Sequence, residues 1–487
     1  MNSPADTEFI PAPARPSLNA MIEQLIQRAS GAAARPGNQI DILLDSTENF
    51  PEWEAALRGA QESICIEMYI FATDEFGRTI RQILLDKLAE GVAVVLVYDW
   101  IGSLGAHFKR FFRPLVEAGA EVRAYNPPGW FGGLGLLSRN HRKSIIVDEK
   151  VAFVSGLCIS SAWNGNPAKG IAPWRDTGLK LTGPIVQDVL AAFEDTLISQ
   201  GGSMPQQLRN YEEGEACQTG SATGRVLATT PANINTMRLD LNIIGLARQN
   251  LWITDAYFMP TRMYIQALIN AARADVDVRV LVPRTSDIRW IGTVSRTQYR
   301  QLLEAGVRVF EWNGTMIHAK SAIIDGQWAR VGSTNLNLSS WYANRELDIS
   351  IEDPDTVYLL ERAFLKDLEN ATEVILTEEQ HAELQQKRAG MFKGHKALHR
   401  GQVKGMVRQV MQLSQAFDNN LSSTRLVGPS EAWAYVSIGI GMSLFGVFLW
   451  FVPQVLLWPV LFLLVIGGLS VTVQALIQIW RFHRGQR

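Results

Sequence analysis

The chain has 487 residues, which is long for one domain and predicts two or more structural units. Its net charge of −2 excludes the positive field with which a whole protein surface attracts nucleic acid. Its three cysteines are scattered, and no Cys-x-x-Cys or His-x-x-x-His pair occurs before residue 376, so neither a disulfide framework nor a metal site is predicted.

The first 38 residues are predicted to be a flexible N-terminal tail. They begin with a Pro- and Ala-rich run and lack the basic region and apolar core of a signal peptide. Within this tail, residues 20–30 have the spacing of a short amphipathic helix, and residues 31–38 are predicted to be a linker.

Strand and helix patterns then alternate, and their order occurs twice. The strand-like run at 63–71 corresponds to the run at 251–258, and a helix that ends in Glu-Ala-Gly at 117–119 corresponds to one at 304–306. This repetition indicates an internal duplication of about 180 residues.

The alternation of strands and helices predicts an α/β fold, and two related halves are expected to pack about a pseudo-two-fold axis. The first half is expected at 39–200 and the second at 225–375, with a polar, Gly-rich linker at 201–224 between them. Equivalent segments of the two halves are expected to meet at their joint.

The C-terminal region has the pattern of a membrane anchor. Residues 376–430 form a basic segment, and residues 431–481 hold two uncharged runs, 432–451 and 455–480, each long enough to cross a bilayer as a helix. Tryptophans near their ends and basic residues on both outer sides predict a transmembrane hairpin with both ends in the cytoplasm. The protein is expected to be a multi-pass protein of the inner membrane, with its catalytic part on the cytoplasmic side. These helices are also a possible contact for a homo-oligomer.

Two short motifs carry the chemistry. His141, Lys143 and Asp148 are separated by the same intervals as His318, Lys320 and Asp325, and in each motif a serine follows the lysine. Side chains two residues apart on a strand point the same way, so each histidine is expected beside its lysine. A single match could arise by chance. Two matches with similar apolar residues between the lysine and the aspartate indicate one shared site for an anionic, oxygen-rich group such as phosphate.

Such a site can transfer a phosphoryl-type group without metal or cofactor. One neutral histidine attacks phosphorus, and the other donates a proton to the leaving oxygen. Lys143 and Lys320 are expected to clamp the phosphate oxygens, with Ser333 and Asn335 as further donors.

A histidine in this role needs a carboxylate on its far nitrogen. Asp176 is predicted to serve His141, and Glu346 to serve His318, because each lies downstream in the same half. Asp148 and Asp325 complete the motifs beyond the strands and are expected to bind loop amides near the site.

The two His-x-Lys-x4-Asp motifs, followed by Gly-Ser-x-Asn at 332–335, resemble those of the phospholipase D superfamily. Further segments such as IEMYIFATDEFG, YDWIGS and MIHAKSAIID are similar to those of bacterial cardiolipin synthases. The resemblance covers roughly residues 40–375. It implies transfer of a phosphatidyl group from one phosphatidylglycerol to another, with glycerol released, and it favours His141 as the nucleophile. It also implies two duplicated α/β/α sandwich halves with one shared site.

This sequence departs from the family pattern in two places. Cys158 stands where an asparagine is expected after the first motif, and the membrane segments follow the catalytic part.

The aromatic, Gly-rich loop 127–137 is either a packed loop or a lip that contacts lipid. A phospholipase D-type hydrolase, a membrane-tethered nuclease and a non-catalytic lipid-binding scaffold are the alternative functions.

Overall fold

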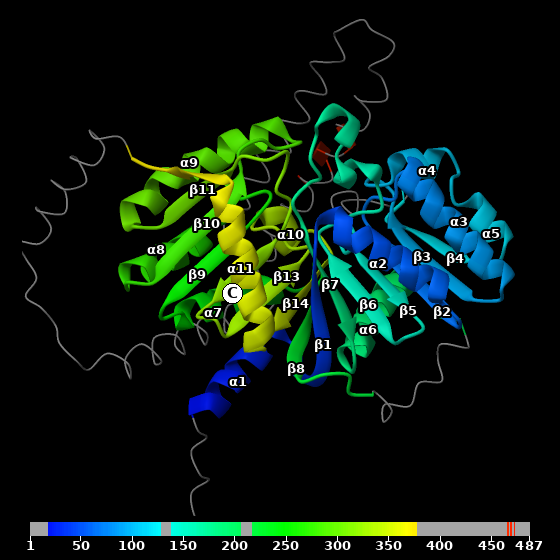
Figure 1. Cartoon of the computed structure of the whole chain (residues 1–487), viewed down its shortest axis with the longest axis horizontal. Coiled ribbons are helices and arrows are strands. Elements are labelled where there is room, and N and C mark those ends of the chain that lie inside the picture. Colours follow the sequence, from blue (N-terminus) through cyan, green and yellow to red (C-terminus); the bar gives the residue numbers. More distant parts are fainter. Residues whose placement is uncertain are drawn as a thin grey trace, which may run out of the picture.

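The computed structural model describes residues 18–127, 138–205 and 217–376, together with five helical residues between 465 and 472. In this part a 15-stranded sheet runs through the protein, in the order β15-β11-β10-β9-β12-β13-β14-β8-β1-β7-β6-β5-β2-β3-β4 (Figure 1). Apart from β15, the order on one side of the β8–β1 pair mirrors the order on the other side. The sheet therefore consists of two equivalent halves.

The first half contains seven strands of the sheet and the helices that cover it. Its strands are β1 (Arg35–Leu44), β2 (Ser63–Met68), β3 (Ala93–Asp99), β4 (Glu121–Tyr125), β5 (Ser144–Val147), β6 (Val151–Ser155) and β7 (Thr177–Thr182). Its helices are α2 (Asp45–Gly59), α3 (Glu75–Ala89), α4 (Leu104–Phe108), α5 (Arg113–Glu117) and α6 (Ile185–Ser199), with two 3-10 turns at Ser161–Asn164 and Pro167–Lys169.

The second half repeats this order with one additional edge strand. Its strands are β8 (Ala222–Thr229), β9 (Asn250–Thr254), β10 (Asp277–Pro283), β11 (Arg308–Trp312), β12 (Ser321–Ile324), β13 (Trp328–Gly332), β14 (Glu346–Ile351) and β15 (Ala371–Val374). Its helices are α7 (Asn235–Leu246), α8 (Arg262–Arg273), α9 (Arg289–Ala305), α10 (Leu338–Tyr342) and α11 (Pro354–Glu369), and α1 (Leu18–Ser30) packs on α7.

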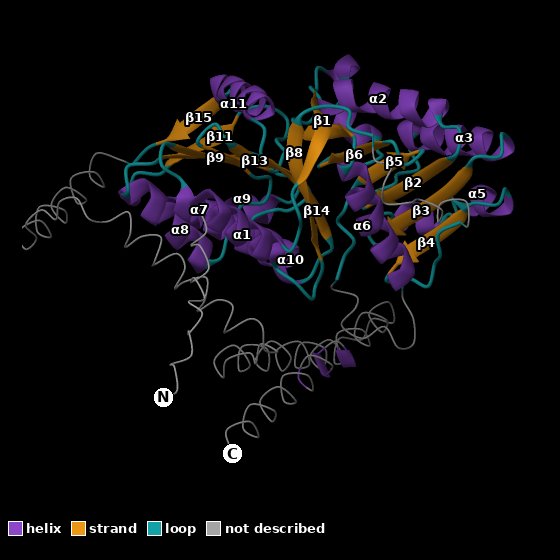
Figure 2. Cartoon of the chain, turned by 90° about the horizontal axis from the view of Figure 1, so that it is seen from below, coloured by secondary structure: helices purple, strands orange, loops and turns teal. Residues whose placement is uncertain are grey.

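Helices cover both faces of the sheet, which is why its central strands are continuous apolar runs. One hydrophobic cluster lies under α2 and α3 of the first half, and a second lies under α7, α8 and α9. A third cluster extends across both halves beneath α6 and α11. Figure 2 shows α6 and α11 close to the central strands. Because α6 also contacts β8 and α11 also contacts β1, each closing helix ties its half to the other.

The predicted α/β fold of two duplicated halves is confirmed within the described residues. The amphipathic helix expected at 20–30 is present as α1, so part of the segment predicted as a tail is ordered structure. The prediction of a linker over 31–38 is wrong at its end, because β1 already begins at Arg35 and pairs with β8. Arg35 pairs there with Gly224, which explains why this polar stretch is held in a strand.

The structure describes five residues of the predicted membrane hairpin: Val465, Ile466, Gly468, Leu469 and Thr472. The remainder of the hairpin, the basic segment from 377 onward and the loop residues 128–137 lie outside the described residues. Among the helices that are described, none is long and apolar enough to cross a membrane.

Candidate active site

The two histidine motifs meet where the halves join. The backbone N–H of His141 donates to the carbonyl of Arg345 at 2.9 Å, and that of His318 donates to the carbonyl of Arg175 at 2.7 Å. Each motif is thus fixed by a segment of the opposite half. The predicted joint at the two motifs is present in the fold.

On the second-half side, His318 and Lys320 project from the start of β12 into one buried space, as the spacing predicts. The ammonium Nζ of Lys320 lies 2.9 Å from Nε2 of His318. The ring nitrogen Nδ1 of His318 is 2.7 Å from Oδ2 of Asp176. His318 and Lys320 are both buried, as is Asp176.

On the first-half side, His141 and Lys143 have an equivalent arrangement. Nδ1 of His141 is 2.8 Å from Oε2 of Glu346. Lys143 Nζ donates to the carbonyl of His141 at 2.5 Å and lies 5.2 Å from the ring centre of Tyr69. A buried, oriented imidazole beside a buried lysine is therefore present twice.

The predicted pairing of carboxylates within each half is wrong. Glu346 of the second half binds His141, and Asp176 of the first half binds His318. The cause is the pair of bridges between Asn140 and Arg345 and between Arg175 and Ile317, which places each carboxylate opposite the other half's histidine. Neighbours in sequence order cannot reveal such an exchange.

Ser333 has a different position from the one predicted. Its hydroxyl donates to Oε2 of Glu346 at 2.7 Å and accepts from the backbone N–H of Leu347 at 2.9 Å. Its contacts are therefore with the carboxylate that orients His141, and the expected role as a phosphate donor is not what the geometry favours.

Asn335 and Cys158 occupy equivalent places in the two halves. The backbone N–H of Gly332 donates to the carbonyl of Lys320, and that of Ser155 donates to the carbonyl of Lys143. Asn335 lies three residues after Gly332, and Cys158 lies three residues after Ser155. The side-chain oxygen of Asn335 is buried and has no hydrogen-bond partner among the described atoms. Cys158 is buried, and burial raises the pKa of its thiol.

A glycine makes room for one of the two carboxylates. A Cβ atom on Gly156 would lie 2.3 Å from Oδ1 of Asp176. In the second half the equivalent position is Ser333, whose side chain contacts Glu346 instead. The carboxylates are thus positioned by different means.

Asp148 and Asp325 stabilise backbone and do not reach the histidines. The Asp148 carboxylate accepts from the backbone N–H groups of Gln61, Glu62 and Ser63. Asp325 accepts in the same way from Arg248, Gln249 and Asn250. These segments begin β2 and β9, whereas the histidines lie at the other ends of those strands. The expectation that Asp148 and Asp325 bind backbone amides is confirmed. The expectation that these amides lie near the site is wrong.

Burial and cationic neighbours keep the imidazoles neutral. Burial and the charge of Lys320 lower the pKa of His318 to about 4. Burial also lowers the pKa of His141. Burial lowers the pKa of Lys320 to about 8, which leaves it charged at neutral pH. An incoming phosphate anion would offset the repulsion from the lysines and favour protonation of one imidazole.

The carboxylates stay ionised in spite of their burial. Burial raises the pKa of Asp176, but His318 and Lys320 outweigh this effect and hold the pKa below its usual value. For Glu346 burial likewise raises the pKa, but His141 and Lys143 outweigh this effect and hold the pKa below its usual value. Each histidine therefore faces a carboxylate that can stabilise its protonated form.

Aromatic side chains around the histidines were not identified from the sequence. Tyr69 packs edge-on against His141, with ring centres 4.9 Å apart, and Tyr257 packs against His318 at 5.8 Å. Trp163 and Trp174 also contact His318, and Trp163 Nε1 donates to Asp176 at 3.2 Å. The two tyrosines follow equivalent strands, β2 and β9, so alignment of the halves was the signal that could have found them.

Arg142 is a second feature that the motif alone does not reveal. Its buried guanidinium donates to the carbonyls of Glu346 and Thr229 in the second half and of Ala192 in the first. It lies between His141 and Lys143 in the chain and points away from them, as strand alternation requires. This side chain ties the two halves together directly behind the site.

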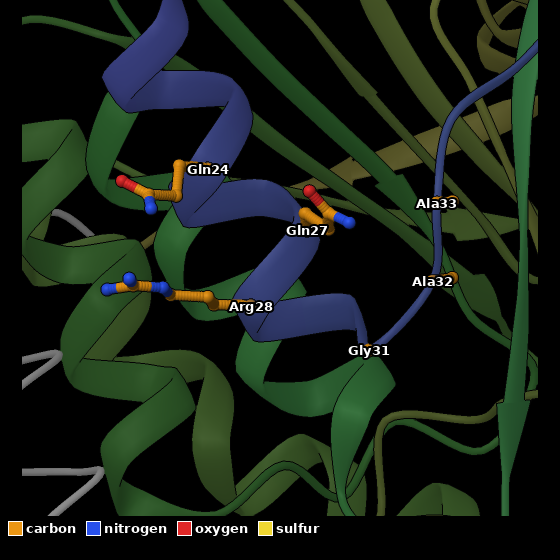
Figure 3. A pocket seen from close by; sticks show the side chains of 6 residues that line it. All are labelled: Gln24, Gln27, Arg28, Gly31, Ala32 and Ala33. Atoms are coloured by element: carbon orange, nitrogen blue, oxygen red, sulfur yellow. The ribbon is translucent and has the colours of Figure 1, made fainter. Parts of the chain in front are cut away.

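A separate surface cavity of about 430 Å³ lies beside α1, lined by Gln24, Gln27, Arg28, Gly31, Ala32 and Ala33 (Figure 3). Arg28 is its one titratable lining residue, so it offers no acid-base pair or nucleophile. Within the described ranges there is also no group of three or more His, Cys, Asp and Glu placed to hold a metal ion.

Known proteins share both the sequence pattern and the fold. A family model described as "Cardiolipin synthase, PLD-like domain" matches residues 53–163 and 241–368. Cardiolipin synthase 1 of Bacillus cereus is 30% identical over 367 residues, which cover 72% of this chain and 71% of that protein. Cardiolipin synthase A of Pseudomonas fluorescens is 32% identical over 345 residues, 69% of this chain and 70% of that protein.

A solved structure supports the architecture. The crystal structure of a phosphatidylserine synthase from Haemophilus influenzae superposes with a TM-score of 0.58 at 15% identity, covering 77% of this chain and 98% of that one. At this identity the likeness concerns the fold alone.

Proposed function

This chain belongs to the cardiolipin synthases with a phospholipase D-like domain, and from that premise we propose that its crossed histidine site makes cardiolipin from two phosphatidylglycerol molecules. The observation that carries the proposal is the pair of buried His-Lys units, each oriented by a carboxylate of the opposite half. Two such units at one joint suit a two-step displacement at a phosphodiester.

In the first step, Nε2 of one neutral histidine attacks the phosphorus of the donor phosphatidylglycerol. The bond from phosphorus to the headgroup glycerol oxygen breaks, and the second histidine donates a proton to that oxygen so that glycerol leaves. Lys143 and Lys320 stabilise the charge on the non-bridging oxygens, and the amide of Asn335 is a further donor. The product is a phosphatidyl-histidine.

In the second step, the second histidine takes a proton from a glycerol hydroxyl of another phosphatidylglycerol. The oxygen attacks phosphorus, the phosphorus–nitrogen bond breaks, and cardiolipin forms with both histidines restored. We assign the nucleophile to His141 and the acid-base role to His318, because the family resemblance favours that order. Asp176 then stabilises the imidazolium of His318 when it carries the proton.

We also propose that the uncharged segments 432–451 and 455–480 anchor the chain in the inner membrane as a hairpin, with the catalytic part in the cytoplasm. Epitope tags at either end, probed with an impermeant reagent on spheroplasts, test this topology. Both tags are expected to be protected until the membrane is opened.

Incubation of membranes holding the protein with labelled phosphatidylglycerol tests the activity. Cardiolipin and free glycerol in equal amounts are expected, and neither should form with a His141→Ala variant. Phosphatidic acid without cardiolipin would instead assign a hydrolase, in which water reaches the same intermediate.

A further inference from the structure

Six large apolar side chains are exposed at the edge of the sheet where the active site opens. They come from both halves and are here named the apolar rim: Ile101, Leu104, Phe108, Ile288, Trp290 and Leu338. Phe108 is 70% exposed, and Trp290 and Leu338 are each 60% exposed. Single exposed apolar residues are ordinary, so the informative point is where these six lie.

The rim follows equivalent strands of the two halves. The first-half group comes after β3, and Ile288 and Trp290 come after β10. Strands β2 and β3 are parallel, as are β9 and β10, so their carboxyl ends share one edge with Tyr69 and Tyr257, which contact the histidines. Figure 1 shows α4 and α9 at the upper edge of the two halves. The rim therefore lies on both sides of the site.

Cationic side chains lie at the same level as the rim. Lys109 and Arg110 follow Phe108 directly, and Arg262 begins α8 after β9. All three are exposed, and none forms an ion pair with a carboxylate of the described residues. Apolar and aromatic side chains beside basic ones suit an anionic lipid surface, where the rings enter the headgroup layer and the charges meet phosphate.

We infer that the apolar rim seats the mouth of the active site on an anionic phospholipid bilayer, so that both lipid substrates enter from the membrane plane. This inference rests on the proposed function, since a lipid-using site has to open toward its substrate. A second copy of the chain on the rim would cover the site between the two groups. A bilayer covers it with substrate.

Fluorescent probes on the full chain in vesicles test the contact. Cys217 is the exposed cysteine, whereas Cys65 and Cys158 are buried, so a Cys217→Ser background accepts a single label. Phe108→Cys and Trp290→Cys, labelled with an environment-sensitive dye, are expected to shift to the blue and lose emission when the phosphatidylglycerol carries brominated acyl chains.

Matched controls exist in each half. Val116 on α5 and Tyr358 on α11 are 53% and 57% exposed, but they precede β4 and follow β14 at the opposite edge. Labels at these two positions are expected to keep their emission. Equal quenching at all four positions, or none at Phe108 and Trp290, would overturn the inference. So would a rim signal that depends on protein concentration in lipid-free detergent, because it would indicate self-association.

The double variant Phe108→Ser and Trp290→Ser adds a functional readout. Turnover of phosphatidylglycerol in vesicles is expected to drop severalfold. Turnover of a monomeric short-chain analogue should be unchanged, because neither side chain belongs to the pairs that His141 and His318 form with their carboxylates and lysines. Equal loss on both substrates contradicts the inference. Quenching at the rim without cardiolipin formation would support the inference and refute the proposed function.

Discussion

His141 and Glu346 lie 205 residues apart in the chain, yet Nδ1 of the histidine is 2.8 Å from the glutamate oxygen Oε2. The same exchange joins His318 to Asp176 at 2.7 Å. Neither half of the protein therefore holds a complete histidine-carboxylate pair. This dependence makes the joint between the halves part of the catalytic apparatus.

The crossed pairs give a specific expectation for the carboxylates. Glu346→Gln should lower the pKa of His141 and leave His318 unaffected, and Asp176→Asn should do the reverse, because each carboxylate raises the pKa of the imidazole it faces. Histidine NMR titrations of the two variants check this. Turnover should fall about 10²- to 10⁴-fold in each. A shift in the histidine of the same half would contradict the crossed arrangement.

Ser333 is expected to act through Glu346. In Ser333→Ala the carboxylate loses a donor and the Leu347 N–H loses an acceptor, which costs about 1–3 kcal/mol. We expect kcat to fall about tenfold with KM little changed. Trp163→Phe is the corresponding variant for the other pair, because it removes the indole donor to Asp176. A rise in KM with unchanged kcat would return Ser333 to direct phosphate binding.

Asp148 and Asp325 are expected to matter for stability and not for chemistry. Replacing either by alanine leaves three backbone N–H groups without their acceptor and should lower the free energy of unfolding by about 1–3 kcal/mol. Urea titration measures this, and kcat of the folded fraction should be retained. Lys150→Ala, which removes an exposed ion pair with Glu62, is the control and should cost less than about 1 kcal/mol.

The alkaline limb of the pH profile is expected to belong to Lys320. Because its pKa is about 8, the side chain loses its proton, and with it its attraction for phosphate, as the pH rises through that value. The profile of kcat/KM should thus fall above about pH 8. The acid limb reflects protonation of the nucleophile His141 and should lie below the ordinary histidine pKa, because burial lowers the pKa of that imidazole. In Lys320→Arg the alkaline limb should move upward. If the alkaline limb does not move in this variant, it belongs to another group.

The phosphatidyl-histidine can be trapped directly. Brief acid quenching with a labelled donor, followed by mass spectrometry, should find the adduct on His141, and His318→Ala should slow its formation and breakdown. An adduct on His318 would reverse the two roles. Because the lysines supply the positive charge in this mechanism, EDTA should leave turnover unchanged, and a loss that added metal restores would contradict it.

The sequence alone determined the two-fold repetition, the α/β class and the placing of each histidine beside its lysine. These follow from local rules: apolar spacing marks strands and helices, and alternation puts residues two apart on one side of a strand. The amide-binding role of Asp148 and Asp325 also followed, because both stand on turns directly after their strands.

Only the tertiary structure decided which carboxylate serves which histidine, what Ser333 contacts and where Tyr69 and Tyr257 lie. These contacts depend on how the strands of one half align with those of the other, through the bridges Asn140–Arg345 and Arg175–Ile317. Spacing within one half carries no information about that alignment. Residues from both halves therefore form one site. The packing of the joint alone decides which carboxylate pairs with which histidine.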